Sequence, residues 1–317
     1  MSINIATQKE TQMTKPYSKL IGALMIALFA TTASAKDTVQ DPQPTGTSCT
    51  KDTFAITAAG LSGTPQQTLP GAIQATSCIG IYATPNNLGT YNVEAPNLGY
   101  LGNGLLNGEK NSAGVAIVSP TQFITSSQLQ DLNPNTNGAI DPGWVQLGTL
   151  ASNSGTMTTM SVTPTGGTAF NLSNVLSYTQ TVTNSTNGGG LTGGIAGTWT
   201  LTVNPNIVNI LHEKGLFQRS SFDQLAFELK AGSNWAVYDF DFTKIGGFDL
   251  TKPYTISGTF NLNDFRNPTN NADQNISLLS VWARDPVNVN EVPEPGTLAV
   301  FGAGLLSLAA LRRRQRK

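Results

Sequence analysis

Histidine, cysteine and charge are all scarce in this sequence of 317 residues. It has one histidine, His212, and two cysteines, and only 12% of its residues are charged. The Gly-x-Ser-x-Gly, Cys-x-x-Cys and His-Glu-x-x-His motifs do not occur, so a nucleophile elbow and the common zinc motifs are missing. A Ser–His–Asp hydrolase would have to use His212 as its base. We therefore expect His212 to be a surface residue, and predict no enzyme activity, metal or cofactor.

Basic residues are outnumbered in the central part of the chain. Ten of the 18 basic residues and 17 of the 19 acidic residues fall within residues 36–291, which therefore carry a net charge of −7, against −1 for the full chain. Such a body repels nucleic acid and anionic lipid. Thr, Asn, Ser and Gly supply its polarity, a composition that suits an extracellular β-protein. We predict no nucleic-acid partner.

The N-terminus has the layout of a secretory signal peptide, with a basic region, an apolar core and a small-x-small cleavage site. These three parts are Lys15 with Lys19, residues 20–30, and Ala33 with Ala35. We predict cleavage before Lys36, so that residues 1–35 are removed, and Met13 is an alternative start to Met1. A membrane anchor is the less favoured interpretation, because the apolar run is short and ends in a processing site.

The C-terminal 26 residues, 292–317, combine three parts in a fixed order. Pro293-Glu294-Pro295 keeps the chain open, residues 297–311 are apolar and uncharged, and a basic tail follows. As a helix the apolar run would span roughly 22 Å, less than the ~30 Å hydrocarbon core. We predict a single transmembrane sorting helix over 297–311, which Arg312, Arg313 and Arg314 stop on the cytoplasmic side. The alternative is a buried core helix with a solvated basic end.

The order of Pro-Glu-Pro, short membrane segment and arginine cluster resembles the PEP-CTERM sorting signal of Gram-negative bacteria. The resemblance implies an exported protein processed near Pro293–Pro295 by a membrane sorting enzyme, an exosortase. The strands around Trp199, Trp235 and Trp282 are also similar to ectodomains found upstream of such signals. Those ectodomains often end in a Ser-His-x-Ser-x-Tyr strand, where this chain has Leu278 and Trp282 at the His and Tyr positions.

Cys49 and Cys78 are the only cysteines. Export would place them where disulfides persist, and no histidine lies near them in sequence to complete a metal site. A disulfide would close a 30-residue loop and stabilise the fold by about 3.6 kcal/mol on the chain-entropy estimate. Two free thiols and half a metal site are the alternatives, and we predict the disulfide.

Residues 36–291 show short strands with a period of two, separated by turn residues. Residues 60–75 are rich in Gly and Pro, which argues against a helix. Residues 86–110 are typical of a long structured loop or two short hairpins, and residues 206–213 could form one or two helical turns. The fold class predicted is all-β, a single antiparallel β-sandwich with jelly-roll-like or immunoglobulin-like connectivity. The expected strands are 53–58, 78–83, 113–119, 144–150, 168–172, 175–182, 198–203, 221–230, 235–242, 254–262 and 276–283.

Several residues of the body suggest chemistry, and each has a simpler interpretation. Asp239 and Asp241 share a strand face and could be glycosidase carboxylates, although a solvated face is the preferred interpretation. Residues 131–138 alternate oxygen side chains as in a calcium loop, but lack the EF-hand Gly and Glu, which favours a polar turn. The aromatics Trp144, Trp199, Trp235, Trp282, Tyr91 and Tyr100 could form a sugar-stacking platform, although core packing is expected of the tryptophans. Asn171, Asn184 and Asn275 lie in Asn-x-Ser/Thr sequences, which mean little in a bacterial protein.

The sequence thus predicts a signal peptide (1–35), a β-sandwich ectodomain (36–291) and a sorting signal (292–317). The expected function is that of an exported cell-surface or matrix protein, structural or adhesive in exopolysaccharide or biofilm. Its expected partners are an exosortase-type enzyme, the inner membrane during sorting, and exopolysaccharide. The alternatives are a carbohydrate-binding module and a matrix glycosidase.

Overall fold

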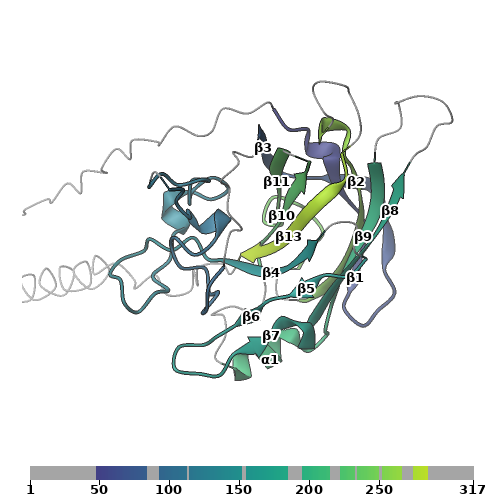
Figure 1. Cartoon of the computed structure of the whole chain (residues 1–317). Coiled ribbons are helices and arrows are strands. Elements are labelled where there is room, and N and C mark those ends of the chain that lie inside the picture. Colours follow the sequence, from purple (N-terminus) through teal and green to yellow (C-terminus); the bar gives the residue numbers. More distant parts are fainter. Residues whose placement is uncertain are drawn as a thin grey trace, which may run out of the picture. The chain divides into compact units, whose positions relative to one another are not determined.

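The structure is a computed structural model, and it describes residues 48–83, 93–112, 114–151, 155–184, 195–214, 222–232, 234–249, 252–265 and 274–284 (Figure 1). Within these residues the strands form two large antiparallel sheets and one two-stranded ribbon, β6 (Ser161–Val162) with β7 (Phe170–Asn171). One α-helix, α1 (Ile207–Glu213), is described. The 3₁₀ turns are η1 (Lys51–Thr53), η2 (Leu105–Asn107), η3 (Ser126–Gln128), η4 (Leu172–Asn174) and η5 (Asn263–Phe265).

The first sheet, sheet A, has five strands in the order β2-β1-β12-β9-β8. Its strands are β1 (Phe54–Leu61), β2 (Gln67–Gln74), β8 (Leu176–Asn184), β9 (Ile195–Val203) and β12 (Tyr254–Asn261). Alternation decides which side is buried: Trp199 and Leu201 of β9 are buried, while Thr198 and Thr202 are exposed. One face of sheet A therefore belongs to the core and the other carries hydroxyl groups.

The second sheet, sheet B, has six strands in the order β3-β11-β10-β13-β4-β5. Its strands are β3 (Ser77–Ala83), β4 (Trp144–Ala151), β5 (Thr158–Thr159), β10 (Gln224–Ala231), β11 (Asn234–Asp241) and β13 (Ile276–Arg284). The strands β10 and β11 form a hairpin in continuous register from Gln224–Asp241 to Ala231–Asn234. Every residue of β11 except Asn234 is buried, so this strand is covered on both faces.

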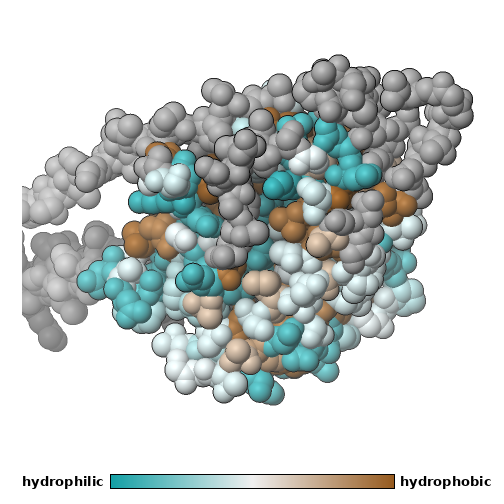
Figure 2. All heavy atoms as spheres, in the orientation of Figure 1, coloured by the Kyte–Doolittle hydropathy of each residue, from teal (hydrophilic) through white to brown (hydrophobic). Residues whose placement is uncertain are grey.

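The main core fills the space between the two sheets. Phe54 stacks on Phe227 with ring centroids 4.9 Å apart, and Trp199 of sheet A lies 4.8 Å from the same ring of sheet B. Each such buried side chain contributes on the order of 2–3 kcal/mol from removal of apolar area from water. Over the described atoms visible in Figure 2, hydrophobic residues are scattered among polar ones rather than gathered in one patch. The all-β antiparallel sandwich predicted from the sequence is confirmed.

A second apolar layer covers the outer face of sheet B. We call residues 93–142, of which residue 113 is not described, the cover segment; it is the irregular blue-to-teal chain beside β4 and β13 in Figure 1. From this segment Leu105, Leu106 and Phe123 pack with Trp144 and Trp282 of the sheet. The packed residues of the second layer are Ile79, Tyr82, Leu105, Leu106, Ile117, Val118, Phe123, Trp144, Ala226, Trp235, Val237 and Trp282.

Two asparagines fix the cover segment to the backbone of β4. The Asn107 amide donates to the carbonyl of Trp144 over 2.8 Å and accepts from the Trp144 N–H over 3.1 Å. Asn97 makes the same pair of bonds with Gln146, at 2.9 and 3.0 Å. Since β5 pairs with β4 only at Gly148 and Thr149, the side-chain amides satisfy this stretch of the β4 edge as a neighbouring strand would.

The structure adds the two-residue strands β5 and β6, which were not expected, and it differs from the expected strands in three further places. β2 lies within residues 60–75, where Gly and Pro argued against a helix and no strand was expected; it tolerates Pro70 because it is an edge strand, with no partner needed on one side. The strand expected over 113–119 is wrong: its described residues make one isolated bridge, Lys110 with Ala116, because this stretch packs onto a sheet instead of joining one. The strand expected over 168–172 shrinks to the two residues of β7.

Candidate functional site

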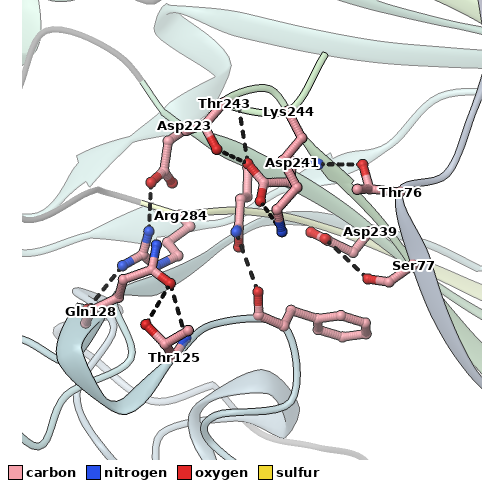
Figure 3. Close-up of polar contacts among 12 residues, drawn as sticks. Thr76, Ser77, Thr125, Gln128, Asp223, Asp239, Asp241, Thr243, Lys244 and Arg284 are labelled. Atoms are coloured by element: carbon pink, nitrogen blue, oxygen red, sulfur yellow. Dashed lines mark hydrogen bonds and ion pairs between the residues drawn. The ribbon is translucent and has the colours of Figure 1, made fainter.

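The two aspartates of β11, Asp239 and Asp241, lie on the face of sheet B opposite to Tyr238 and Phe240, and their polar partners include Ser77, Thr243 and Lys244 (Figure 3). Their exposed fractions are 1% and 3%, so the prediction of a solvated strand face is wrong. The alternation of β11 was identified correctly, because the opposite face of the strand places Tyr238 and Phe240 in the main core. Alternation alone could not reveal that the acidic face is buried as well.

Asp241 is held as an anion. Its carboxylate forms an ion pair with Lys244, with Oδ2 and Nζ 2.7 Å apart, and accepts hydrogen bonds from the backbone N–H and the hydroxyl of Thr243. Burial acts to raise the pKa of Asp241, but the hydrogen bonds from Lys244 and Thr243 outweigh it, and the pKa lies below its usual value.

Asp239 has the opposite character. Its Oδ2 accepts a hydrogen bond from the Ser77 hydroxyl over 3.3 Å, while its Oδ1 is buried and has no partner among the described residues. Burial, and then the negative charge of Asp241, raise the pKa of Asp239 well above its usual value. Two neighbouring carboxyls with separated pKa values resemble the acid and base of a glycosidase. However, neither side chain is accessible to a sugar ring.

Arg284, at the end of β13, connects sheet B to the cover segment (Figure 3). It is 1% exposed and forms an ion pair with Asp223 through Nη1. Its Nη2 donates to the carbonyl of Gln128 over 2.9 Å, and its Nε donates to the carbonyl of Pro142 over 3.2 Å. Since both carbonyls belong to the cover segment, the buried guanidinium fixes that segment on the sheet.

Glu228 is a further buried carboxyl that the sequence analysis did not identify. It lies on β10, is 2% exposed, and accepts hydrogen bonds from the Trp282 indole, over 3.3 Å, and from Ser280. Burial raises the pKa of Glu228 to about 7, and the charge of Glu109 on the cover segment acts in the same direction. The sequence contained one signal for its position. Glu228 lies between Phe227 and Leu229 in the strand, so it points to the opposite face, the same face as Ala226.

All four tryptophans are buried, with exposed fractions between 0% and 2% for Trp144, Trp199, Trp235 and Trp282. The expectation that they pack in the core is confirmed, and a sugar-stacking platform built on them is wrong. Trp199 belongs to the main core, while the other three lie under the cover segment. Tyr100 is half-buried, and Tyr91 lies outside the described residues.

The remaining candidates are the two cysteines, the possible calcium loop, metal binding in general, and His212. The disulfide is confirmed: Cys49 and Cys78 are bonded, with Cα atoms 6.2 Å apart. In the residues 131–138, the Asn133 side chain accepts from the backbone N–H of Asn135, which closes a polar turn. Within the described part of the chain, no group of three or more His, Cys, Asp or Glu is placed to hold a metal ion. His212 lies in α1, and its side chain is not described.

The three Asn-x-Ser/Thr positions have different surroundings. Asn171 accepts hydrogen bonds from the Ser173 N–H and the Thr159 hydroxyl, and so caps η4. Asn184 ends β8, and Asn275 is exposed immediately before β13. The side chain of Asn171 is thus engaged in local structure.

The sorting segment and the signal peptide both lie outside the described residues. This applies to Ala33 and Ala35, to Pro293, Glu294 and Pro295, and to Arg312, Arg313 and Arg314. Among the described residues, no helix combines the length and the apolar character needed to cross a membrane.

Residues 291–314 match the family model of the PEP-CTERM protein-sorting motif. The matched span contains the Pro-Glu-Pro sequence, the apolar run and the three arginines. No curated protein and no solved structure matches the chain.

Proposed function

The chain carries a PEP-CTERM protein-sorting motif, and we propose that it is an exported protein whose tail is removed near Pro293–Pro295 by an exosortase-type enzyme. The single observation that carries this proposal is the match over residues 291–314, which marks the chain for export and sorting to the cell surface. The division into a signal peptide (1–35), an ectodomain (36–291) and a sorting signal (292–317) belongs to the same proposal.

The proposed mechanism is topological. The signal peptide exports the body, and the apolar run 297–311 halts in the inner membrane. Arg312, Arg313 and Arg314 remain on the cytoplasmic side, because moving arginine through the hydrocarbon core is costly. The Pro-Glu-Pro sequence is thereby presented on the outer side, where the proline rings keep it extended and accessible to the sorting enzyme.

For the ectodomain we propose a non-enzymatic role, structural or adhesive, in an extracellular polysaccharide matrix or biofilm. The disulfide suits an oxidising compartment, and the buried state of Asp239 and Asp241 disfavours the matrix glycosidase alternative. The alternative of a carbohydrate-binding module that stacks sugars on tryptophan is disfavoured by the burial of all four. The two packed sheets are compatible with the jelly-roll-like or immunoglobulin-like connectivity that we keep as part of the proposal.

The test is the intact mass of the protein recovered from its native host. We expect a species that begins at Lys36, ends near Pro293–Pro295 and lacks two hydrogens because of the Cys49–Cys78 bond. A species that keeps residues 297–317 would make the tail a permanent anchor and overturn exosortase processing. As a control, replacing Arg312, Arg313 and Arg314 by alanine should abolish the processed species, whereas replacing Lys110, a basic residue of the body, should not.

A further inference from the structure

The outer face of sheet A is an ordered array of hydroxyl groups. On β8 and β9, Thr181 pairs with Thr198 and Thr179 pairs with Thr200. On the other side of β9, Thr198 pairs with Thr259 of β12 and Thr200 pairs with Ser257. With Ser177 and Thr202, which also pair, these residues form what we call the hydroxyl face: Ser177, Thr179, Thr181, Thr198, Thr200, Thr202, Ser257 and Thr259.

This face is open and regular. Six of its side chains are exposed, and Thr200 and Ser257 are half-buried. Adjacent strands lie about 4.8 Å apart and same-face residues recur about every 6.8 Å along a strand, so the hydroxyls form a repeating grid. The Thr200 and Ser257 hydroxyls lie 2.9 Å apart, and Ser257 donates to the Gln66 side chain over 2.8 Å, which fixes the centre of the grid.

Charge is missing from this face as far as the structure describes it. Beyond Thr259 and Ser257, the grid continues onto Ala55 and Ala58 of β1 and then onto Gln74 and Thr68 of β2, all uncharged. In typical soluble domains about 25% of all residues are charged. The body of this protein is acidic, yet none of the residues paired on this face is a carboxylate. A partner held by ionic contacts would find nothing to bind here.

We propose that the hydroxyl face binds a neutral polyhydroxylated polymer, that is, an uncharged polysaccharide. Hydroxyls donate and accept hydrogen bonds with sugar hydroxyls, and exchanging them for water costs far less than desolvating charges. Each such contact is weak, so binding requires many at once along an extended chain rather than one sugar in a pocket. An acidic polysaccharide is disfavoured by the net charge of the body. This inference rests on the proposed function, because the polymer is met outside the cell.

The experiment is a co-sedimentation assay with the full chain as its host processes it. The neutral probes are amorphous cellulose, curdlan, cross-linked dextran and agarose, and the anionic probe is an alginate gel. We expect binding to at least one neutral polymer and not to alginate. The double variant T179K/T198K, placed on the grid, should reduce the affinity about tenfold or more, since it loses two or more hydrogen bonds.

The matched control is T165K/T168K, which makes the same change of charge at two exposed threonines in the loop between β6 and β7. It should bind as the unsubstituted protein does. The variant T179A/T198A removes the hydroxyls without adding bulk and should weaken binding several-fold. Thermal unfolding followed by circular dichroism checks that each variant is folded.

Three outcomes would overturn the inference: no binding to any neutral polymer, equal binding by T179K/T198K and T165K/T168K, or a dimer in sedimentation velocity that T179K/T198K dissociates. The third would make the hydroxyl face an interface between two copies. The intact mass reports on export and sorting independently, so a correctly processed protein without polymer binding refutes this inference alone.

Discussion

The buried carboxyl of Glu228 should make the stability of the protein depend on pH. The carboxyl lies under the cover segment, with its charge opposed by burial first and then by Glu109. It also receives hydrogen bonds from Ser280 and the Trp282 indole, and Lys230 on the same strand acts in favour of the charged form. The folded protein therefore binds a proton at Glu228 more tightly than the unfolded chain does, and this sets the direction of the pH dependence.

The magnitude follows from the rise in pKa from 4.5 to about 7. Each tenfold change in proton affinity is worth 1.36 kcal/mol, so ionised Glu228 destabilises the folded state by about 3 kcal/mol. Below about pH 4 the group is protonated in both states and costs nothing. As the pH rises from about 4.5 to 7 the unfolded chain releases its proton first, so stability falls, and above pH 7 the loss is complete.

The variant Glu228→Gln keeps the shape and an acceptor for the Trp282 indole, but removes the charge. Urea unfolding of the two proteins between pH 4 and pH 8 should give equal free energies at pH 4. At pH 8 the variant should be more stable by about 3 kcal/mol. Glu213→Gln, at an exposed position, is the matched control and should leave the profile unchanged. A constant difference between Glu228→Gln and the unsubstituted protein across this range would refute the argument.

Three further predictions concern the joints of the fold. Replacing Arg284 by methionine should lower the free energy of unfolding by about 3–5 kcal/mol, because the buried Asp223 carboxyl, whose pKa burial already raises, loses its ionic partner, and adding Asp223→Asn should recover part of the loss in a double-mutant cycle. Asn107→Ala should cost about 2–3 kcal/mol in urea unfolding, since a buried N–H and a buried carbonyl of β4 lose their partners, and an effect below 0.5 kcal/mol would contradict this. Replacing Cys49 and Cys78 by serine should lower stability by about 3–4 kcal/mol, and a reducing agent should have no further effect on that variant.

Alternation along single strands was sufficient to predict most of the sandwich. The runs around Trp199 and Tyr238 alternate, and each became a strand with the expected aromatic face in the main core, while the run around Val281 became a strand as expected. The disulfide was also predictable, because only one pairing of two cysteines exists. In each case the information lies within a few residues or in a count, so no tertiary contact was needed.

The buried polar contacts of Asp239, Asp241 and Arg284 could not be predicted in the same way. Whether Asp239 faces water or is buried depends on contacts with distant residues, such as Ser77, which lies 162 positions earlier and whose hydroxyl donates to the Asp239 carboxyl. The cover segment is held by side-chain amides, carbonyls and Arg284, which form no repeating pattern. The edge strand β2 was missed for a related reason, since Pro70 is acceptable only where a sheet has a free edge.

The strand order has a consequence for the time course of assembly. Strand β12 joins β1 to β9 in sheet A, and β13 joins β10 to β4 in sheet B, so the last two strands of the chain occupy interior positions. A chain that leaves the cell N-terminus first delivers them last. Only nine positions separate Arg284 from Pro293, a reach of about 30 Å at most. In the proposed topology, the body would therefore remain as unjoined parts until the tail itself has arrived at the membrane.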